Sequence, residues 1–303
     1  MKSVQVLLSS YNGEKYIARQ IESILAQEDV DIHLLVRDDG SKDGTRTILS
    51  DYERRFPEKI RVVTGDNLGY KKSFFSLIQL AGEYDYYAFA DQDDYWLPDK
   101  EISSIRGMEK DSDDIPKLAQ VDFIVTDENL KPLVPAPAYR ELRIDKHDYV
   151  YVGDFFQGCL MTWNRKAMEL LKSYMPQRDY SHDHWVGKVI YLLGRVYVVP
   201  EGNIYYTRHG DNASTTDDRM GGRLLRIKSL FHGKSNVYDN IGQDLLDGYR
   251  SFLLPHDVQM CEDFAQYKHK FAAKRRLLMN GNLRRTSFLA TVLYKFCILI
   301  NRV

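Results

Sequence analysis

The stretch Asp91-Gln92-Asp93-Asp94 brings three carboxylates within four residues. It follows the apolar, aromatic run 86–90, which predicts a buried strand with the carboxylates at its C-terminal end. Carboxylates this close repel one another unless a cation, or a ligand that carries one, offsets their charge. Oxygen ligands of this kind suit Mg²⁺ or Mn²⁺. Taken alone, the pattern also fits a solvated acidic turn, so the rest of the chain must decide.

The first hundred residues alternate between predicted strands and predicted helices. Apolar runs predict strands at 4–8, 32–36, 60–64 and 86–90, and helical spacing of apolar residues falls between them at 17–25, 45–56 and 71–80. This alternation indicates a mostly parallel sheet with helices on both faces. The loops 9–13, 38–43 and 91–94 should then meet at one edge of the sheet, where α/β proteins bind ligands. Because the chain has neither a Walker A nor a GxGxxG motif, a phosphate would be bound through the metal.

The pattern is less regular from residue 98 onward. Pro98 predicts the start of a helix that runs to about residue 110, and Pro132, Pro135 and Pro137 predict a long irregular connection that could act as a lid. The other predicted elements are a strand at 120–126, an aromatic strand at 153–163 followed by a helix, a helix opened by 181–185, and strands at 195–199 and 203–207.

Composition limits the classes of function. The chain has 303 residues, 44% of them hydrophobic, which is ample for a globular core. A net charge of −1 argues against a nucleic-acid partner held by overall charge. Cys159, Cys261 and Cys297 contain no CxxC pair and indicate neither a disulfide framework nor a zinc site. With no signal peptide and no apolar run long enough to span a membrane, we expect a cytoplasmic protein.

Five motifs, taken together and in this order, resemble those of bacterial family 2 glycosyltransferases. They are 9–13, 38–45, 91–100, 182–185 and 208–212, and the resemblance covers about residues 1–215. The Asp-Gln-Asp-Asp-x-Trp stretch is most similar to the rhamnosyltransferase branch. The resemblance implies a GT-A fold and inverting transfer from a nucleoside-diphosphate sugar to a polysaccharide or lipid-linked glycan. Within the matched region we expect a nucleotide-sugar-binding half (1–100) and an acceptor-binding half (101–215), and we expect the remaining residues 216–303 to form a basic helical C-terminal extension.

The resemblance also implies roles for individual residues. Asp183 falls where the family carries its catalytic base, and Asp93 would be the main cation ligand, with His209 able to reach the metal. The residues implied in nucleotide-sugar binding are Ser9, Tyr11, Asn12, Asp39, Asp91, Lys100 and Arg208. Those implied on the acceptor or sugar side are Trp96, Trp163, His182 and Trp185. His184 departs from the bulky aromatic residue that is usual in this branch. A partly closed site should raise the pKa of Asp183 by desolvation.

Each of these assignments has a structural alternative. The role of Tyr11 could be limited to packing at the end of its strand, and the role of Asp39 could be limited to forming a turn with Gly40. Asp183 could be a helix N-cap, His209 a hydrogen-bonded structural residue, Trp163 a core residue and Lys100 a solvated helix residue. For the whole protein, the alternatives are a UDP-hexose transferase, a sugar-phosphate nucleotidyltransferase and an inactive glycan-binding protein. The loop 9–13 lacks the basic, glycine-rich character expected of a nucleotidyltransferase.

The C-terminal segment is basic. No acidic residue follows Asp263, whereas nine lysines and arginines do. The segment 223–231 has an amphipathic helical pattern, and 288–300 is apolar around a single Lys295. Such segments either lie in a membrane interface or pack on another protein surface, and the sequence leaves both open. Peripheral contact with the inner face of the cell membrane would suit a lipid-linked acceptor.

Overall fold

The computed structural model describes residues 1–133, 150–151, 153, 155–208, 240–285 and 287–303, and for 201–203 it describes the backbone alone. The chain divides into two compact units. The N-terminal unit comprises Met1–Leu142, Phe155–Met175 and Asp179–His209. The C-terminal unit comprises Arg143–Asp154, Pro176–Arg178 and Gly210–Val303.

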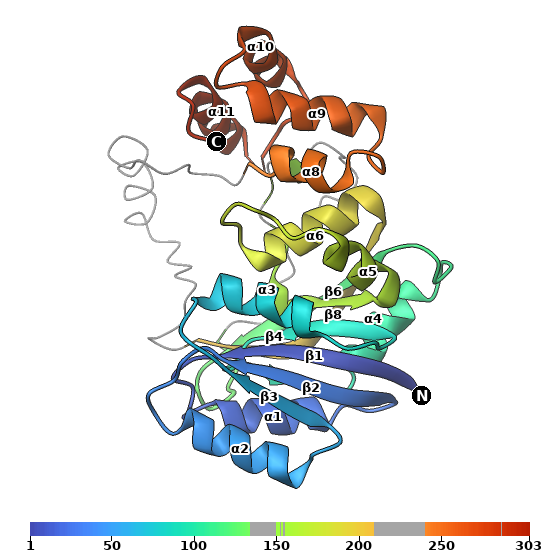
Figure 1. Ribbon diagram of the computed structural model, residues 1–303, viewed down its shortest axis with the longest axis vertical. Helices are drawn as coiled ribbons and strands as arrows, with labels where there is room; N and C mark the ends of the chain where they lie inside the picture. The colour runs from blue at the N-terminus through green and yellow to red at the C-terminus, as the bar shows by residue number, and fades with distance from the viewer. Residues whose placement is uncertain (134–149, 152, 154, 209–239, 286) are drawn as a thin grey trace. The chain divides into compact units, whose positions relative to one another are not determined.

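The N-terminal unit is built on a sheet whose eight described strands lie in the order β3-β2-β1-β4-β7-β6-β8-β5 (Figure 1). The strands are β1 (Lys2–Ser10), β2 (Val30–Asp38), β3 (Ile60–Thr64), β4 (Tyr86–Ala90), β5 (Tyr95–Trp96), β6 (Lys117–Thr126), β7 (Met161–Asn164) and β8 (Arg195–Thr207). β3, β2, β1 and β4 are mutually parallel, as are β6 and β8, while β7 and β5 pair antiparallel with their neighbours. The predicted mostly parallel α/β sheet is therefore confirmed.

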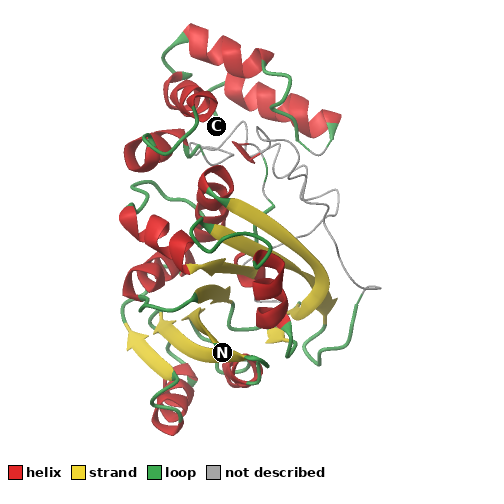
Figure 2. Cartoon of the chain, turned by 90° about the vertical axis from the view of Figure 1, so that its right-hand side faces the viewer, coloured by secondary structure: helices red, strands yellow, loops and turns green. Residues whose placement is uncertain are grey.

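Helices cover both sides of this strand layer (Figure 2). In the N-terminal unit they are α1 (Ile17–Leu25), α2 (Thr45–Arg55), α3 (Tyr70–Leu80), α4 (Lys100–Met108), α5 (Arg165–Ser173) and α6 (His182–Leu193). α1 shows why the spacing of apolar residues was informative, since Ile17, Ile21 and Ile24 share one face and all three are buried. The β1 residues 4–8 are buried on both faces, as expected of a central parallel strand.

Two predicted strands differ from the structure. The segments 195–199 and 203–207 form the single strand β8, because a bulge in its pairing with β6 accommodates the intervening Pro200 and Gly202. The aromatic segment 153–163 is a strand only from Met161, since the 3₁₀ helix η2 (Gly158–Leu160) precedes β7. Of the proline-rich connection, Pro132 bridges to Thr126, while Pro135 and Pro137 lie outside the described residues.

The C-terminal unit is helical in its described part, which confirms the predicted C-terminal helices. It contains α8 (Gly242–Tyr249), α9 (Pro255–Gln266), α10 (Phe271–Met279) and α11 (Phe288–Leu299). Buried polar contacts tie it together: the Tyr151 hydroxyl donates to Asp257 at 2.8 Å, and Arg276 donates to the buried carboxylate of Asp263. None of the helices in the described ranges is long and apolar enough to cross a membrane. The predicted amphipathic segment 223–231 lies outside the described residues.

Candidate active site

Three polar loops begin at one edge of the sheet, as the sequence predicted. In the register of the parallel strands, Ser10 at the end of β1 pairs with Asp38 at the end of β2, and Leu8 pairs with Ala90 at the end of β4. β1 lies between β2 and β4, so the chain reverses its order of strand addition there. Such a switch point opens a crevice at the carboxyl ends of the strands, which is where open α/β sheets bind ligands.

The loop after β4 is tied to the loop after β1 by Gln92. The Tyr11 backbone N–H donates to Gln92 Oε1 at 2.9 Å, and Gln92 Nε2 donates to the Tyr11 carbonyl at 3.1 Å. A Cβ on Gly13 would lie 2.3 Å from Gln92 Oε1, so this approach requires glycine. The Tyr11 side chain remains 45% exposed and offers a ring face to a ligand. Sequence analysis missed the role of Gln92, whose amide can donate and accept at once.

The loop after β2 is joined to the loop after β1 by a second set of hydrogen bonds. Asn12 Oδ1 accepts from the Lys42 N–H at 2.8 Å, and the Asn12 N–H donates to Ser41 Oγ at 2.9 Å. Asn12 has a positive φ of 48°, which its short polar side chain tolerates better than most. The side-chain oxygen of Asn12 therefore shapes the loop. Ser9 likewise bonds within the protein, to Ser73 Oγ at 2.7 Å.

Asp39, implied in nucleotide binding, is buried among donors of the protein itself. Its carboxylate accepts from the Leu68 N–H at 2.8 Å and the Gly69 N–H at 2.9 Å, and it forms an ion pair with Arg37. Gly69 has a φ of 80°, which favours glycine, so this turn and Asp39 support each other. Asp39 thus holds the loop 65–69 in place. Its structural role therefore extends beyond the turn with Gly40 that the sequence suggested.

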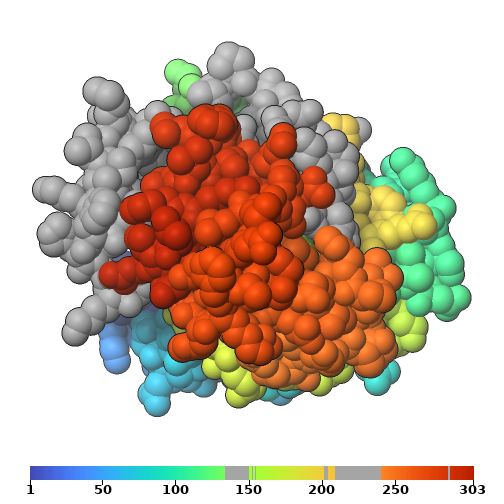
Figure 3. All heavy atoms as spheres, turned by 90° about the horizontal axis from the view of Figure 1, so that it is seen from above, coloured from blue at the N-terminus to red at the C-terminus, as the bar shows by residue number. Residues whose placement is uncertain are grey.

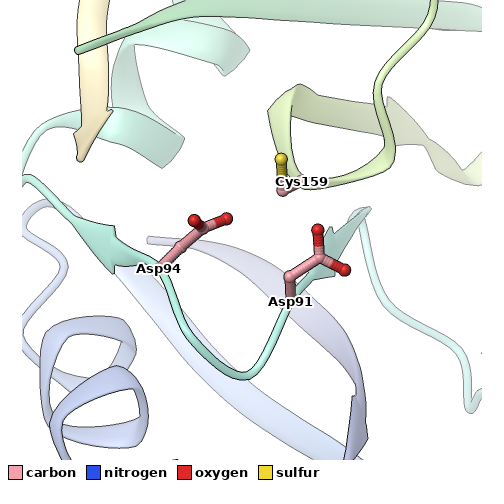
Figure 4. A group of neighbouring side chains, drawn as sticks. All are labelled: Asp91, Asp94 and Cys159. Carbon is pink, nitrogen blue, oxygen red and sulfur yellow. The ribbon is translucent and has the colours of Figure 1, made fainter. Parts of the chain in front are cut away.

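Beyond β4, the side chains of Asp91, Asp94 and Cys159 converge (Figure 4). One ligand atom from each lies within 4.8 Å of the others. Burial raises the pKa of Asp91 to about 7, and the charges of Asp93 and Asp183 act in the same direction. Burial also raises the pKa of Asp94 well above its usual range, with further contributions from Asp93 and Asp91.

This acidic cluster fits a divalent cation. Asp94 Oδ1 accepts a long 3.4 Å bond from the Thr207 N–H, and the Cys159 side chain lies within hydrogen-bonding reach of the carboxyl. Asp94 Oδ2 is buried without a regular hydrogen bond among the described residues. A buried, unpaired carboxylate oxygen is costly, and a bound cation would offset that cost. The sequence assigned the cation to Asp93 and His209; His209 lies outside the described residues, and the close group is instead Asp91, Asp94 and Cys159. No pattern in the sequence indicated Cys159.

Asp183 lies near the same loop cluster, in the first turn of α6. The N-cap position belongs to Ser181, so Asp183 is not the N-cap of this helix. Its carboxylate accepts from Ser181 Oγ and from the His184 N–H at 2.8 Å. Burial acts to raise the pKa of Asp183, but the electrostatic interaction with the His182 and His184 rings, together with these hydrogen bonds, lowers it below its usual value. The expected raised pKa of Asp183 is therefore wrong.

The 3₁₀ helix η2 connects Asp183 with the acidic cluster. A Cβ on Gly158 would lie 2.7 Å from His182 Nε2 and 3.6 Å from the Cβ of Asp183. The next residue, Cys159, faces Asp91 and Asp94. His182 itself is buried, stacked on Phe74 with ring centroids 4.0 Å apart, and burial lowers its pKa to about 4. Its ring is thus neutral at pH 7 and packs in the core, away from an acceptor sugar.

Four of the residues with implied ligand contacts are buried. Trp96, Trp163 and Trp185 are almost completely buried. Lys100 is also buried, with its Nζ 2.6 Å from Glu101 Oε1 and 3.8 Å from the centre of the Trp96 ring. Large aromatic side chains gain most by leaving water, which outweighed their placement in the motifs.

Arg208 keeps an exposed position at the end of β8, where its backbone N–H donates to the Thr126 carbonyl at 2.9 Å. Its side chain therefore stays accessible beside Thr207, the residue whose N–H points at Asp94. The exposed or partly exposed candidates brought to this edge of the sheet are Tyr11, Asp91, Asp93, Asp183 and Arg208.

Comparison with known proteins identifies a matching family model and relatives that match part of the chain. The model of the family described as Glycosyl transferase family 2 matches residues 5–171. An uncharacterized glycosyltransferase of Nostoc sp. is 29% identical over 216 residues, covering 69% of this chain and 66% of that protein. The dTDP-rhamnosyl transferase RfbG of Shigella flexneri is 39% identical over 97 residues, covering 31% and 34%. The chain thus spans less than two thirds of the length of these relatives.

Solved structures share the fold. Residues 1–349 of S. aureus TarS in complex with UDP-GlcNAc superpose with a TM-score of 0.58 at 19% identity, covering 100% of this chain and 79% of that one. The mannosyltransferase PcManGT from Pyrobaculum calidifontis, in complex with GDP-Man and Mn²⁺, gives a TM-score of 0.50 at 15% identity, covering 98% and 79%. The fold of the chain is therefore of the GT-A type, as expected.

Proposed function

Because the chain belongs to glycosyl transferase family 2, we propose that it transfers a sugar from a nucleoside-diphosphate donor to a hydroxyl of a polysaccharide or lipid-linked glycan. One observation carries the proposal: Asp183 lies close enough to Asp91 for its charge to raise the pKa of that carboxyl. A cation-binding cluster and a candidate base therefore share one crevice. We assign the reaction to the cytoplasm and to the assembly of bacterial surface glycans.

The donor side of the site would hold the diphosphate through a divalent cation. Asp91 and Asp94 would supply carboxylate oxygens, with the charge of Asp93 nearby, and bound Mg²⁺ or Mn²⁺ would act as a Lewis acid toward the departing diphosphate. Cys159 adds a soft donor, which favours Mn²⁺ over Mg²⁺. PcManGT, which shares the fold, is complexed with Mn²⁺. The exposed ring of Tyr11, at the end of β1, is placed to stack on the nucleobase.

The acceptor side would depend on Asp183. Its lowered pKa keeps the carboxylate charged at neutral pH, ready to accept the proton of an acceptor hydroxyl. Direct displacement at the anomeric carbon requires the base and the leaving group on opposite faces of the donor sugar. Asp183 lies against Gly158 and the acidic cluster lies against the next residue, Cys159, so the two groups are neighbours around η2. Inversion of configuration is the outcome that we propose.

For the donor we propose dTDP-rhamnose. The support is the match with RfbG, which is named as a dTDP-rhamnosyl transferase. RfbG is 39% identical over 31% of this chain, whereas the Nostoc relative is 29% identical. A UDP-hexose is the alternative, because the TarS structure that shares this fold holds UDP-GlcNAc.

The proposal is tested first by binding. A thermal-shift series with UDP, dTDP and GDP, each with and without Mn²⁺, should show a melting temperature that rises most with dTDP and Mn²⁺ together. Release of nucleoside diphosphate from the matching sugar donor then reports turnover. If no nucleotide raises the melting temperature, and if Asp93→Ala and Asp183→Asn both keep the turnover of the unchanged protein, the proposed function is wrong.

A further inference from the structure

Helix α11 is apolar on two opposite faces, and only one of them is packed. Tyr294, Cys297 and Ile298 are buried in the C-terminal unit. The other face carries five exposed apolar side chains, which we call the α11 stripe: Phe288 (86% exposed), Leu289 (75%), Val292 (48%), Phe296 (37%) and Leu299 (54%). At 3.6 residues per turn, these five fall within an arc of about 100°. A continuous exposed stripe of this kind marks an interaction surface.

The orientation of α11 is fixed by contacts with α10. Lys295 Nζ donates to the carbonyls of Leu278 at 2.8 Å and Asn280 at 2.9 Å, at the C-terminal end of α10. Lys274 Nζ donates to the Leu299 carbonyl at 3.2 Å, at the last turn of α11. These bonds use two lysines to dock the helices side by side. They leave the α11 stripe without a charged residue within it.

The surroundings of the stripe are positively charged. The exposed side chains of Lys270, Arg275 and Arg284 lie on or beside α10, which packs against α11, whereas Arg276 is already paired with Asp263. Since no acidic residue follows Asp263, nothing in the remaining sequence cancels this charge. In Figure 3 the residues at the red end of the colour bar, which include α10 and α11, lie side by side. An apolar stripe bordered by cations complements a surface that is apolar inside and anionic outside.

We propose that the α11 stripe docks this protein on an anionic lipid bilayer, with the helix lying in the plane of the interface. Twelve residues make a helix of about 18 Å, well short of the roughly 30 Å of a hydrocarbon core, so α11 lies on the membrane and does not span it. Phe, Leu and Val side chains enter the acyl boundary while lysine and arginine contact the headgroups. The proposal goes beyond the sugar transfer proposed above and holds whether or not that is correct.

Co-sedimentation of the full chain with lipid vesicles tests the proposal. The unchanged protein should pellet with phosphatidylcholine vesicles that contain phosphatidylglycerol, and about tenfold less with phosphatidylcholine alone, with binding weakened by salt. The double variant Phe288→Ser/Leu289→Ser should lose about tenfold or more of the binding. The matched control Phe252→Ser/Leu254→Ser removes side chains that are 66% and 60% exposed between α8 and α9, and it should bind like the unchanged protein.

A second pair of variants tests the charge. Arg275→Gln/Arg284→Gln should weaken binding to the anionic vesicles, while Arg61→Gln/Lys110→Gln, which removes two exposed cations of the N-terminal unit, should not. If Phe288→Ser/Leu289→Ser binds as well as the unchanged protein, or if the control falls equally, the proposal is overturned. It is also overturned if vesicles do not bind while sedimentation velocity shows self-association that this variant abolishes, since the stripe would then contact a second copy.

Discussion

Replacing Asp91 by asparagine tests the electrostatics of the acidic cluster directly. Asp91 is partly buried beside Asp93 and Asp183, and its pKa is raised from 3.8 to about 7. The folded protein therefore holds a proton on Asp91 that the unfolded chain has already released above about pH 4. As a result, ionisation of Asp91 favours unfolding, and its contribution lowers the free energy of unfolding progressively as the pH rises from 4 to 7.

The expected size of the effect follows from the two pKa values. A difference of about three pKa units corresponds to roughly 4 kcal/mol, which is reached in full above pH 7 and is absent below pH 4. Asparagine does not titrate, so Asp91→Asn should gain about this much free energy of unfolding over the unchanged protein between pH 4 and pH 8. Titrating groups distant from Asp91 are common to both proteins and cancel in the difference. The carboxyl of Asp94, whose pKa Asp91 helps to raise, is the neighbour that also responds to the substitution.

Urea denaturation of both proteins at pH 4.5, 6 and 8, with EDTA present, measures this difference. The exposed carboxylate Asp99 provides the control, because Asp99→Asn should follow the unchanged protein at every pH. Adding Mn²⁺ at pH 8 should stabilise the unchanged protein more than Asp91→Asn, since the cation replaces the lost proton. A free-energy difference between Asp91→Asn and the unchanged protein that stays constant from pH 4.5 to 8 would refute the reasoning.

Three further predictions concern single side chains. Asp183→Asn should lower turnover by about 10²–10⁴-fold while the thermal shift with nucleotide and Mn²⁺ persists, because only the base is lost. Cys159→Ser should abolish the near-ultraviolet sulfur-to-metal absorption expected on adding Cd²⁺, whereas Cys261→Ser, a buried cysteine of the C-terminal unit, should keep it. Glu101→Gln should cost about 3–5 kcal/mol in urea denaturation, since it leaves the buried ammonium of Lys100 without its carboxylate.

The periodicity of apolar residues predicted most of the strands and helices in the first hundred residues. The strand at 86–90 and the helix with Ile17, Ile21 and Ile24 on one face were both predicted correctly, because the spacing of apolar residues in the sequence indicates which side chains are buried. The meeting of the loops followed from the alternation of strands and helices alone. The single strand β8 was not predicted, since a proline such as Pro200 usually ends a strand. Here β8 continues past Pro200 because its pairing with β6 contains a bulge.

Side-chain direction was harder to predict than position. Trp96 and Lys100 fall in the motif that carries Asp91, yet both turn inward, and the sequence does not say which face of a short loop is covered. Asp39 was assigned to nucleotide binding, and its hydrogen bonds from the Leu68 and Gly69 amides were not predicted because these amides come from a separate loop. Cys159 could not be found at all, since its meeting with Asp91 and Asp94 depends on β7 pairing with β4.

The two halves of the proposed chemistry are coupled through adjacent residues of one short turn. Gly158 has no room for a Cβ against His182, which fixes η2 relative to the start of α6 and therefore relative to Asp183. Cys159 fixes the same turn relative to Asp91 and Asp94. The separation of base and cation is thus set by a rigid contact within the N-terminal unit, where a shift of about 1 Å would be enough to misalign an in-line displacement. Cores around such turns tolerate little change in volume, so the packing of His182 on Phe74 would contribute to the geometry of the proposed reaction.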